Sequence, residues 1–163
     1  LIKKIKKIND SVFYTQKRYG INNKTFYIYK FRTMYSDSES RGNTNKDDPR
    51  IYSFAKTIRN LRFDEIPQIV NIFMGQMHLV GPRAEWVELA DQYKKQIINY
   101  RSRHVVKPGI TGWAQIAYPY GQDSYDAEQK LMYDLYYIKN WSIWLELEIC
   151  FKTFLVILDK KGF

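Results

Sequence analysis

The stretch RNLRFDEIPQ, residues 59–68, is the centre of the predicted fold. It begins a predicted helix and places two adjacent carboxylates at the start of that helix. The apolar residues that follow them have helical spacing: Ile66, Ile69, Val70 and Phe73. Pro67 is compatible with a first turn, where backbone N–H groups have no partner inside the helix. We therefore predict a helix over about residues 65–74, with Asp64 as its N-cap and Glu65 as its first residue.

The two carboxylates permit two interpretations. In the first, Asp64 only caps the helix, which is a frequent role of this residue type. In the second, the positive end of the helix dipole keeps Asp64 ionised, so that it acts as a nucleophile or as a ligand of Mg²⁺. Glu65 would then be a base or relay, and Arg59 and Arg62 would hold phosphate oxygens through charge-assisted hydrogen bonds.

Composition narrows the choice of partner and compartment. The 163 residues fit one domain, residues 1–163, and the 26 lysines and arginines exceed the 17 aspartates and glutamates by nine. An anionic partner follows, either a nucleotide, a phospholipid or a nucleic acid. The single Cys150 excludes an internal disulfide and fits a reducing compartment. The sequence shows no zinc pattern, no signal peptide and no apolar run of about 18 residues, the length of a spanning helix.

The remaining elements follow from periodicity and turn residues. Residues 12–16 and 25–31 are rich in β-formers and predict a hairpin with a longish turn. Lys30 and Arg32 share one face of its second strand. They are either a solvated strand edge or a pair of cations that binds phosphate. The polar residues 35–50 form a loop that is a candidate lid over the site. Further segments are a short helix at 51–61, a strand at 77–80, and helices at 86–100, about 123–139 and 141–160.

Both ends of the chain are candidates for contact with a membrane surface. Residues 1–8 are basic and amphipathic, and they are either a membrane contact or a frayed, solvated end. Residues 141–160 are the most apolar, and Trp141 and Trp144 suit the headgroup depth of an interfacial helix, although a buried core helix is the alternative. The predicted fold class is therefore α+β, mostly helical, with a small β-hairpin or sheet and amphipathic interfacial helices.

Four motifs in a fixed order carry a family resemblance: YKFRTM at 29–34, LRFDEIPQ at 61–68, LVGPR at 79–83 and KPGITGWAQ at 107–115. Together they resemble the bacterial sugar transferases, the monotopic polyprenyl-phosphate phosphoglycosyl transferases. The segment YDLYYIKNWS at 133–142 is similar to the members that initiate exopolysaccharide and O-antigen synthesis. The resemblance extends over residues 12–163.

The resemblance implies transfer of a sugar-1-phosphate from a UDP-sugar to undecaprenyl phosphate, with release of UMP and with Mg²⁺ as cofactor. Asp64 would attack the β-phosphate and form a covalent phosphosugar ester, Glu65 would assist, and Asp64 would also contact the metal. Positive charge, phosphate binding and the nucleotide-sugar site would be supplied by Lys30, Arg32, Arg59, Arg83, Glu85 and Asp134. Membership also implies monotopic association with the inner leaflet, on the cytoplasmic face of the bacterial inner membrane.

The sequence departs from the family pattern at a few positions. Family members carry an apolar re-entrant membrane helix before the hairpin, and none is present here, so we expect this chain to be part of a longer protein. Residues 81–85 read GPRAE where GPRPE is usual, and Gln76 and His78 replace the more usual Asp and Ser. These changes weaken inference about the substrate and leave the dyad intact. A homo-oligomer stays possible.

Two other functions compete with the transferase. Net positive charge and many aromatic residues are typical of a nucleic-acid-binding module, but no nucleic-acid motif is recognisable and the basic residues form no single stripe. We therefore expect no nucleic-acid partner. The third possibility is an inactive interaction scaffold that descends from a transferase. Magnesium-dependent use of a UDP-sugar separates the first function from the other two.

Overall fold

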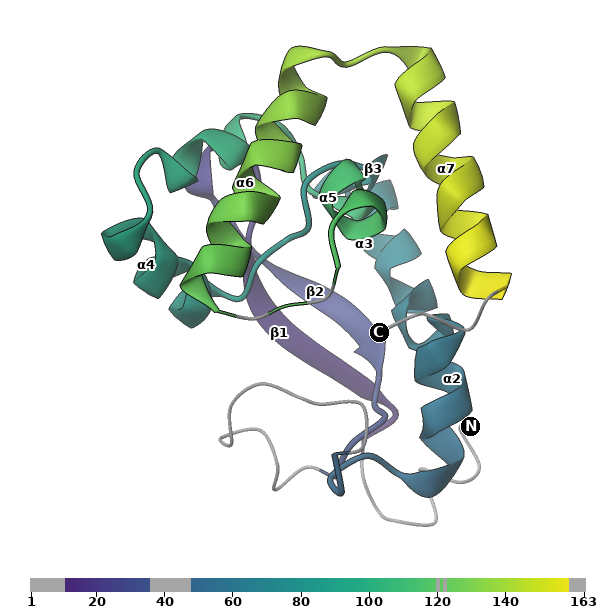
Figure 1. The fold of residues 1–163 in the computed structure, drawn as a ribbon. Helices are drawn as coiled ribbons and strands as arrows, with labels where there is room; N and C mark the ends of the chain where they lie inside the picture. Colours follow the sequence, from purple (N-terminus) through teal and green to yellow (C-terminus); the bar gives the residue numbers. More distant parts are fainter. Residues whose placement is uncertain (1–10, 36–47, 120, 122, 159–163) are drawn as a thin grey trace.

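The computed structural model describes residues 11–35, 48–119, 121 and 123–158. Its architecture is α+β, as predicted, with two separate two-stranded sheets among the helices (Figure 1). The strands are β1 (Phe13–Tyr19), β2 (Thr25–Phe31), β3 (His78–Val80) and β4 (Gly109–Thr111). The α-helices are α2 (Lys56–Asn60), α3 (Ile69–Phe73), α4 (Val87–Gln96), α5 (Trp113–Ala117), α6 (Ser124–Lys139) and α7 (Ile143–Leu158). The 3-10 helices are η1 (Ile21–Asn23), η3 (Ser53–Ala55), η4 (Phe63–Gln68) and η5 (Tyr100–Val105). Residues 1–8, interpreted above as either a membrane contact or a frayed, solvated end, lie outside the described residues.

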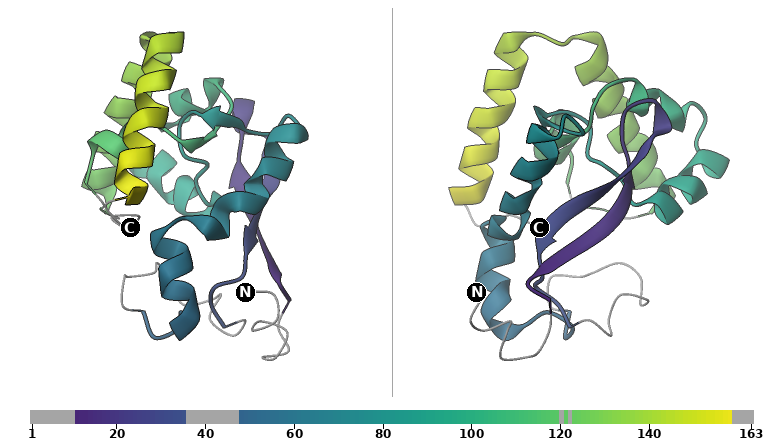
Figure 2. Two further views of the ribbon diagram at one scale, coloured as in Figure 1. Left: turned by 90° about the vertical axis from the view of Figure 1, so that its right-hand side faces the viewer. Right: turned by 180° about the vertical axis from the view of Figure 1, so that it is seen from behind.

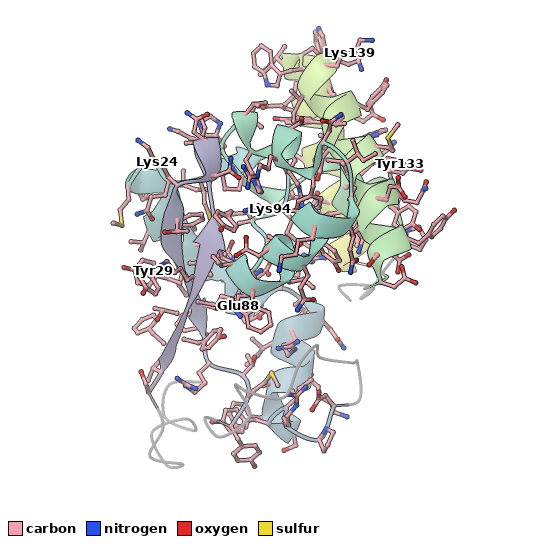
Figure 3. The ribbon with its side chains drawn as sticks, turned by 90° about the vertical axis from the view of Figure 1, so that its left-hand side faces the viewer. Lys24, Tyr29, Glu88, Lys94, Tyr133 and Lys139 are labelled. Carbon is pink, nitrogen blue, oxygen red and sulfur yellow. The ribbon has the colours of Figure 1, made fainter. Side chains whose placement is uncertain are left out.

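The predicted hairpin is confirmed. Strands β1 and β2 pair antiparallel from Phe13 opposite Phe31 to Tyr19 opposite Thr25. The turn places Asn22 and Asn23 in the left-handed region, which asparagine tolerates better than most residues. Helix α4, which carries Glu88 and Lys94, packs against β1 (Figure 3). Lys94 Nζ lies 3.3 Å from the centre of the Tyr19 ring.

The helix that begins at the dyad differs from the prediction in its first turn. Residues 63–68 form the 3-10 helix η4, and the α-helical part, α3, begins only at Ile69. Asp64 is not the N-cap, because Arg62 holds that position with φ 54° and ψ 22°. Arg62 N still bonds back to Arg59 O of α2, so the chain reverses at this left-handed residue and the new helix starts before Asp64. Both carboxylates therefore belong to the first turn of η4.

A buried asparagine fixes this helix pair against the hairpin. The Asn71 side chain is fully buried, and its Nδ2 donates to Tyr27 O at 2.7 Å while its Oδ1 accepts from Tyr29 N at 3.1 Å. The amide thus bonds the edge of β2 as a neighbouring strand would. The contact sets η4 alongside β2, which brings Lys30 next to the dyad.

The glycines on either side of Thr111 allow two backbone segments to approach closely. Strands β3 and β4 are parallel, and Gly81 N donates to Thr111 O at 2.9 Å. A Cβ atom on Gly109 would lie 2.1 Å from Gly81 N, and one on Gly112 would lie 2.2 Å from Gly81 O. Only glycine fits such distances. The Gly81–Pro82 turn is therefore held against β4, and Arg83 emerges from it.

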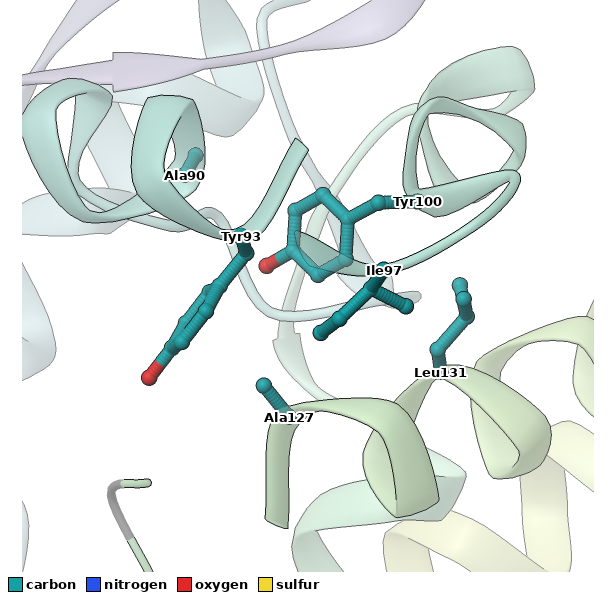
Figure 4. Packing of buried hydrophobic residues seen from close by; sticks show 6 residues of the cluster. All are labelled: Ala90, Tyr93, Ile97, Tyr100, Ala127 and Leu131. Carbon is teal, nitrogen blue, oxygen red and sulfur yellow. The ribbon is translucent and has the colours of Figure 1, made fainter. Parts of the chain in front are cut away.

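The amphipathic segment 86–100 forms the core under the site, although its helix is shorter than predicted. Helix α4 ends at Gln96, because Ile97 is extended, with φ −112° and ψ 120°. The apolar positions still meet α6 in one cluster, shown in Figure 4: Ala90, Tyr93, Ile97, Tyr100, Ala127 and Leu131. The predicted start of α6 is confirmed by a capping box, in which Asp126 N donates to Asp123 Oδ1 at 2.7 Å.

The last helix, α7, lies in front of the other helices in the left view of Figure 2 and at the left-hand edge of the molecule in the right view. It packs against α5 and the β3–β4 pair, and Ile149 is its one buried residue. The alternative of a buried core helix is therefore wrong, since Trp144 is 77% and Phe151 64% exposed. Among the described residues, no helix combines the length and the apolar character needed to cross a membrane.

Candidate active site

A cavity of about 630 Å³ lies between the hairpin, η4, the 81–86 segment and helices α4 to α6. Its volume is typical of sites that bind small molecules. Seven of the eight predicted site residues line it: Lys30, Arg32, Arg59, Asp64, Glu65, Arg83 and Glu85. Asp134 is not among the lining residues. The cavity is also lined by Tyr35 and Arg50, the first and last residues of the predicted lid at 35–50. Residues 36–47 of that segment lie outside the described part of the chain.

Glu65 is the acceptor for three basic side chains. Its Oε1 lies 2.8 Å from Lys30 Nζ and 3.4 Å from Arg83 Nη2, and its Oε2 lies 3.5 Å from Arg62 Nη1. Glu65 is itself buried, with 7% of its surface exposed. A buried carboxylate needs such partners because its desolvation is otherwise costly. The solvated-edge interpretation of Lys30 is therefore wrong, since this lysine faces the dyad.

The surroundings push the pKa values of the two dyad carboxylates in opposite directions. Burial raises the pKa of Glu65, but Lys30, Arg83 and Arg62 outweigh this effect and hold it well below its usual range. Burial also raises the pKa of Asp64, and here Lys30 and Arg59 compensate only in part, while Glu65 adds to the increase. Burial is thus the largest influence on Asp64, where the sequence pointed to the helix dipole. Opposite pKa shifts of this kind are typical of carboxylate pairs whose members have different chemical roles.

The other predicted cations border the same cavity. Arg59 Nη1 donates to Thr33 Oγ1 at 3.1 Å, which ties α2 to the segment after β2. Arg32 Nε donates to Ser11 O at 3.0 Å, and its guanidinium lies 5.7 Å from the centre of the Tyr14 ring. The basic side chains therefore converge on an enclosed space, which suits a small polyanion better than an extended one.

The structure also assigns Arg18 and Arg103 to the cavity wall, which sequence reasoning missed. Arg18 Nη1 lies 3.6 Å from Glu85 Oε1 and donates to Ala84 O at 3.0 Å. Arg103 Nη2 lies 2.7 Å from Asp134 Oδ2, and Asp134 is 1% exposed. Arg103 lies among several basic residues just before KPGITGWAQ, so its charge was visible in the sequence but its partner was not. Arg18 lies beyond the predicted strand at 12–16, and no pattern in the sequence singled it out.

The donor set at the dyad is consistent with Mg²⁺ only when a substrate supplies further ligands. Among the described residues, no group of three or more His, Cys, Asp or Glu side chains could hold a metal ion. Mg²⁺ in phosphate-transferring sites is often bound by one or two carboxylates together with substrate phosphates. Asp64 lines the cavity and, within the described chain, forms no ion pair with a lysine or arginine, so it fits this role.

Comparisons with known proteins identify the family of this chain. The family model described as Bacterial sugar transferase matches residues 1–160. A UDP-N-acetylgalactosamine-undecaprenyl-phosphate N-acetylgalactosaminephosphotransferase of Aeromonas hydrophila is 45% identical over 153 residues, which are 93% of this chain and 36% of that protein. The uncharacterized sugar transferase EpsL of Bacillus subtilis (strain 168) is 40% identical over 156 residues, 96% of this chain and 74% of that protein.

A third relative is the UDP-glucose:undecaprenyl-phosphate glucose-1-phosphate transferase of Escherichia coli (strain K12). It is 39% identical over 146 residues, which are 87% of this chain and 32% of that protein. The chain thus spans about a third of the length of the Aeromonas and Escherichia relatives. Because the family model covers nearly the whole chain and these relatives share 39% to 45% of the aligned residues, the chain belongs to the bacterial sugar transferase family.

Proposed function

We propose that this chain is the catalytic part of a polyprenyl-phosphate phosphoglycosyl transferase. It transfers a sugar-1-phosphate from a UDP-sugar to undecaprenyl phosphate and so initiates exopolysaccharide, capsule or O-antigen synthesis. The proposal rests on two adjacent carboxylates, Asp64 and Glu65, whose pKa values shift in opposite directions. They line one cavity together with Lys30, Arg59 and Arg83. The names of the relatives support the class of donor and acceptor.

The first step is attack of an Asp64 carboxylate oxygen on the β-phosphorus of the UDP-sugar. The new bond joins Asp64 to phosphorus, and the bond from the β-phosphorus to the bridging oxygen breaks. UMP leaves with that electron pair. In the second step a phosphate oxygen of undecaprenyl phosphate attacks the same phosphorus, which releases Asp64 as a carboxylate and yields undecaprenyl-diphosphate-sugar. Asp64 is the one nucleophile that the protein supplies, undecaprenyl phosphate is the second nucleophile, and neither anion needs a base to attack.

The lowered pKa of Glu65 decides its part in this reaction. A carboxylate whose pKa is held so low is a weak base at neutral pH. We therefore assign Glu65 the task of orienting Lys30 and Arg83 toward the transferred phosphoryl group, where positive charge is needed. When bound by Asp64 together with the diphosphate, Mg²⁺ supplies further neutralisation of phosphate charge.

The proposal predicts a covalent adduct. After incubation with Mg²⁺ and UDP-N-acetylgalactosamine, UDP-glucose or UDP-galactose, intact-mass spectrometry is expected to show one added phosphosugar for the accepted donor. No adduct is expected to form when a chelator removes Mg²⁺ before the donor is added, and an adduct that has formed is expected to disappear when undecaprenyl phosphate is added. A chain that gains no mass from any of these donors, in the presence of lipid vesicles, contradicts the proposal.

We further propose that the chain associates with the cytoplasmic face of the bacterial inner membrane as a monotopic protein. Two apolar surfaces are exposed, and α3 and α7 both lie on the right-hand side of Figure 1. Their members are Phe63, Ile66, Ile69, Val70, Phe73 and Met74 around α3, and Trp144, Leu147, Phe151, Phe154, Leu155 and Leu158 on α7. The first surface belongs to the same helix pair as the dyad, which suits an acceptor that resides in the bilayer.

Exchange of Trp144 and Phe151 together for glutamine is expected to weaken vesicle binding about tenfold, because each ring loses its burial in the lipid. Co-sedimentation with anionic vesicles measures the effect, and salt should weaken the electrostatic part of binding. The matched control is Ile98→Gln, which removes a side chain that is 86% exposed on a different part of the surface. If the double variant and Ile98→Gln lose vesicle binding equally, or if the double variant loses none, α7 is not the part of the chain that contacts the membrane.

A further inference from the structure

The buried guanidinium of Arg103 joins α6 to the segment that presents Arg83. Its side chain is 5% exposed. Arg103 Nη2 lies 2.7 Å from Asp134 Oδ2 and donates to the carbonyl oxygen of Arg83 at 3.1 Å, and Nη1 donates to the Tyr100 hydroxyl at 2.6 Å. One planar group therefore contacts α6, η5 and the turn after β3 at the same time, and rotation of the guanidinium would break all three contacts.

At Arg83, side-chain donors add to the backbone pairing, because Arg83 also forms an isolated parallel bridge with Gly109. Gly81 and Pro82 are bonded to β4 through Gly81 N to Thr111 O and Gly109 N to Pro82 O. The next two carbonyls accept from arginine side chains, Arg83 O from Arg103 and Ala84 O from Arg18. Arg103 and the Arg83–Gly109 bridge therefore both hold the peptide plane that follows Arg83, which bears on the direction in which the Arg83 side chain leaves the turn.

The Arg83 side chain completes a connection to the dyad. Its Nη2 lies 3.4 Å from Glu65 Oε1. The contacts therefore run from Asp134 to Arg103, from Arg103 to Arg83 and from Arg83 to Glu65. Asp134 itself is 1% exposed and is not among the residues that line the cavity. A carboxylate in that place has no direct path to a bound UDP-sugar.

We propose that Asp134 is a positioning residue that acts on phosphoryl transfer through Arg103 and Arg83. This inference rests on the proposed function. Asp134 neutralises Arg103 and fixes the rotation of its guanidinium, Arg103 holds the Arg83 carbonyl, and Arg83 keeps its place beside Glu65 and the transferred phosphoryl group. The family resemblance placed Asp134 in the nucleotide-sugar site, whereas the geometry points to a role one layer behind it.

A double-mutant cycle on the rate of adduct formation tests this order of contacts. Asp134→Asn keeps the shape of the side chain and removes its charge. It is expected to slow adduct formation about 10- to 100-fold, as small displacements of a positioning group do. In an Arg83→Gln background the same substitution is expected to change the rate less than about twofold, because residues in one chain of contacts are not additive. An equal fold-loss in both backgrounds overturns the proposal, since Asp134 then acts without Arg83.

Glu146→Gln is the matched control. Glu146 is a partly buried helical carboxylate that accepts from Tyr137 OH at 3.0 Å and Trp141 Nε1 at 2.8 Å, and it does not line the cavity. Its loss is expected to leave the rate within about twofold of the parent in both backgrounds, as for sites without shared partners. Tyr100→Phe removes one acceptor of Arg103 and leaves Asp134 in place. Tyr100→Phe is expected to reduce the rate of adduct formation less than Asp134→Asn does, and this reduction should also disappear in the Arg83→Gln background. It replaces Asp134→Asn in the cycle if that variant does not fold.

A second measurement does not depend on activity. The Nε–H signal of Arg83, assigned by its absence in Arg83→Gln, is expected to shift in the NMR spectrum of Asp134→Asn and to stay in place in Glu146→Gln. A signal that does not move in Asp134→Asn overturns the positioning role. A parent protein that forms no adduct contradicts the proposed function instead, and the NMR result then still decides whether Asp134 positions Arg83.

Discussion

Asp64→Asn is expected to abolish adduct formation and phosphosugar transfer while leaving the protein at least as stable as the parent. The amide cannot attack phosphorus as a carboxylate does, and it is a weaker ligand for Mg²⁺. Intact mass with the accepted UDP-sugar and Mg²⁺ measures the adduct, and urea unfolding at pH 7 measures the stability. The two measurements together separate a nucleophile from a structural carboxylate.

The stability part of this expectation follows from the direction of the pKa shift. Burial raises the pKa of Asp64 above its unfolded value of 3.8. The contribution of Asp64 to stability is therefore fully present below that value and is lost as the pH rises through the folded pKa. At pH 7 the ionised side chain opposes folding, so a neutral Asn removes that penalty. The gain of the variant over the parent should disappear below about pH 3.8.

Asp123→Ala is the matched control, because the Asp123 side chain caps α6. It is expected to lose about 1 kcal/mol of unfolding free energy and to keep adduct formation. Asp64→Ala should not show this loss, since Arg62 occupies the N-cap position of η4 and no side-chain cap bond forms there. Near-parental turnover of Asp64→Asn, without deamidation back to Asp, contradicts the nucleophile assignment.

The sequence predicts the elements well where periodicity and turn chemistry agree. The hairpin has β-formers around Asn22 and Asn23, and α6 has Asp123 at its start, so both local signals point to the structure that forms. The first turn at the dyad was mispredicted because Arg62 adopts a left-handed conformation that aspartate and asparagine adopt more readily than arginine. The cause is tertiary, since α2 must reverse into η4 within two residues.

The sequence predicted which residues belong to the site, but it did not predict which of them contact one another. The motifs assign Lys30, Glu65 and Arg83 to one site, but the two ion pairs among them depend on how β2, η4 and the 81–83 turn meet in space. Asn71 makes one of these junctions, and in the sequence it is only a polar residue within an apolar helix. Asp134 shows the same limit, because its burial behind Arg103 depends on the crossing of α6 and η5.

Glu65→Gln is expected to reduce both stability and activity strongly. It leaves Lys30, Arg83 and Arg62 without their shared negative partner in a buried site, and loss of one member of a buried ion pair costs about 3 kcal/mol of unfolding free energy. The rate of adduct formation should fall about 100-fold, because Lys30 and Arg83 lose the group that orients them. Urea unfolding and intact-mass kinetics measure the two effects.

The pH dependence of that stability loss gives a sharper check than its size. The pKa of Glu65 is held below its unfolded value of 4.5, so its contribution is present above pH 4.5 and is lost as the pH falls through the folded pKa. The difference between parent and Glu65→Gln should be constant near neutrality and should shrink below about pH 4.5. The control is Glu148→Gln, which breaks the exposed pair with Lys152 on α7 and is expected to change stability by about 0.5 kcal/mol or less. If Glu65→Gln unfolds like the parent at pH 7, Lys30, Arg83 and Arg62 are stabilised by groups other than Glu65.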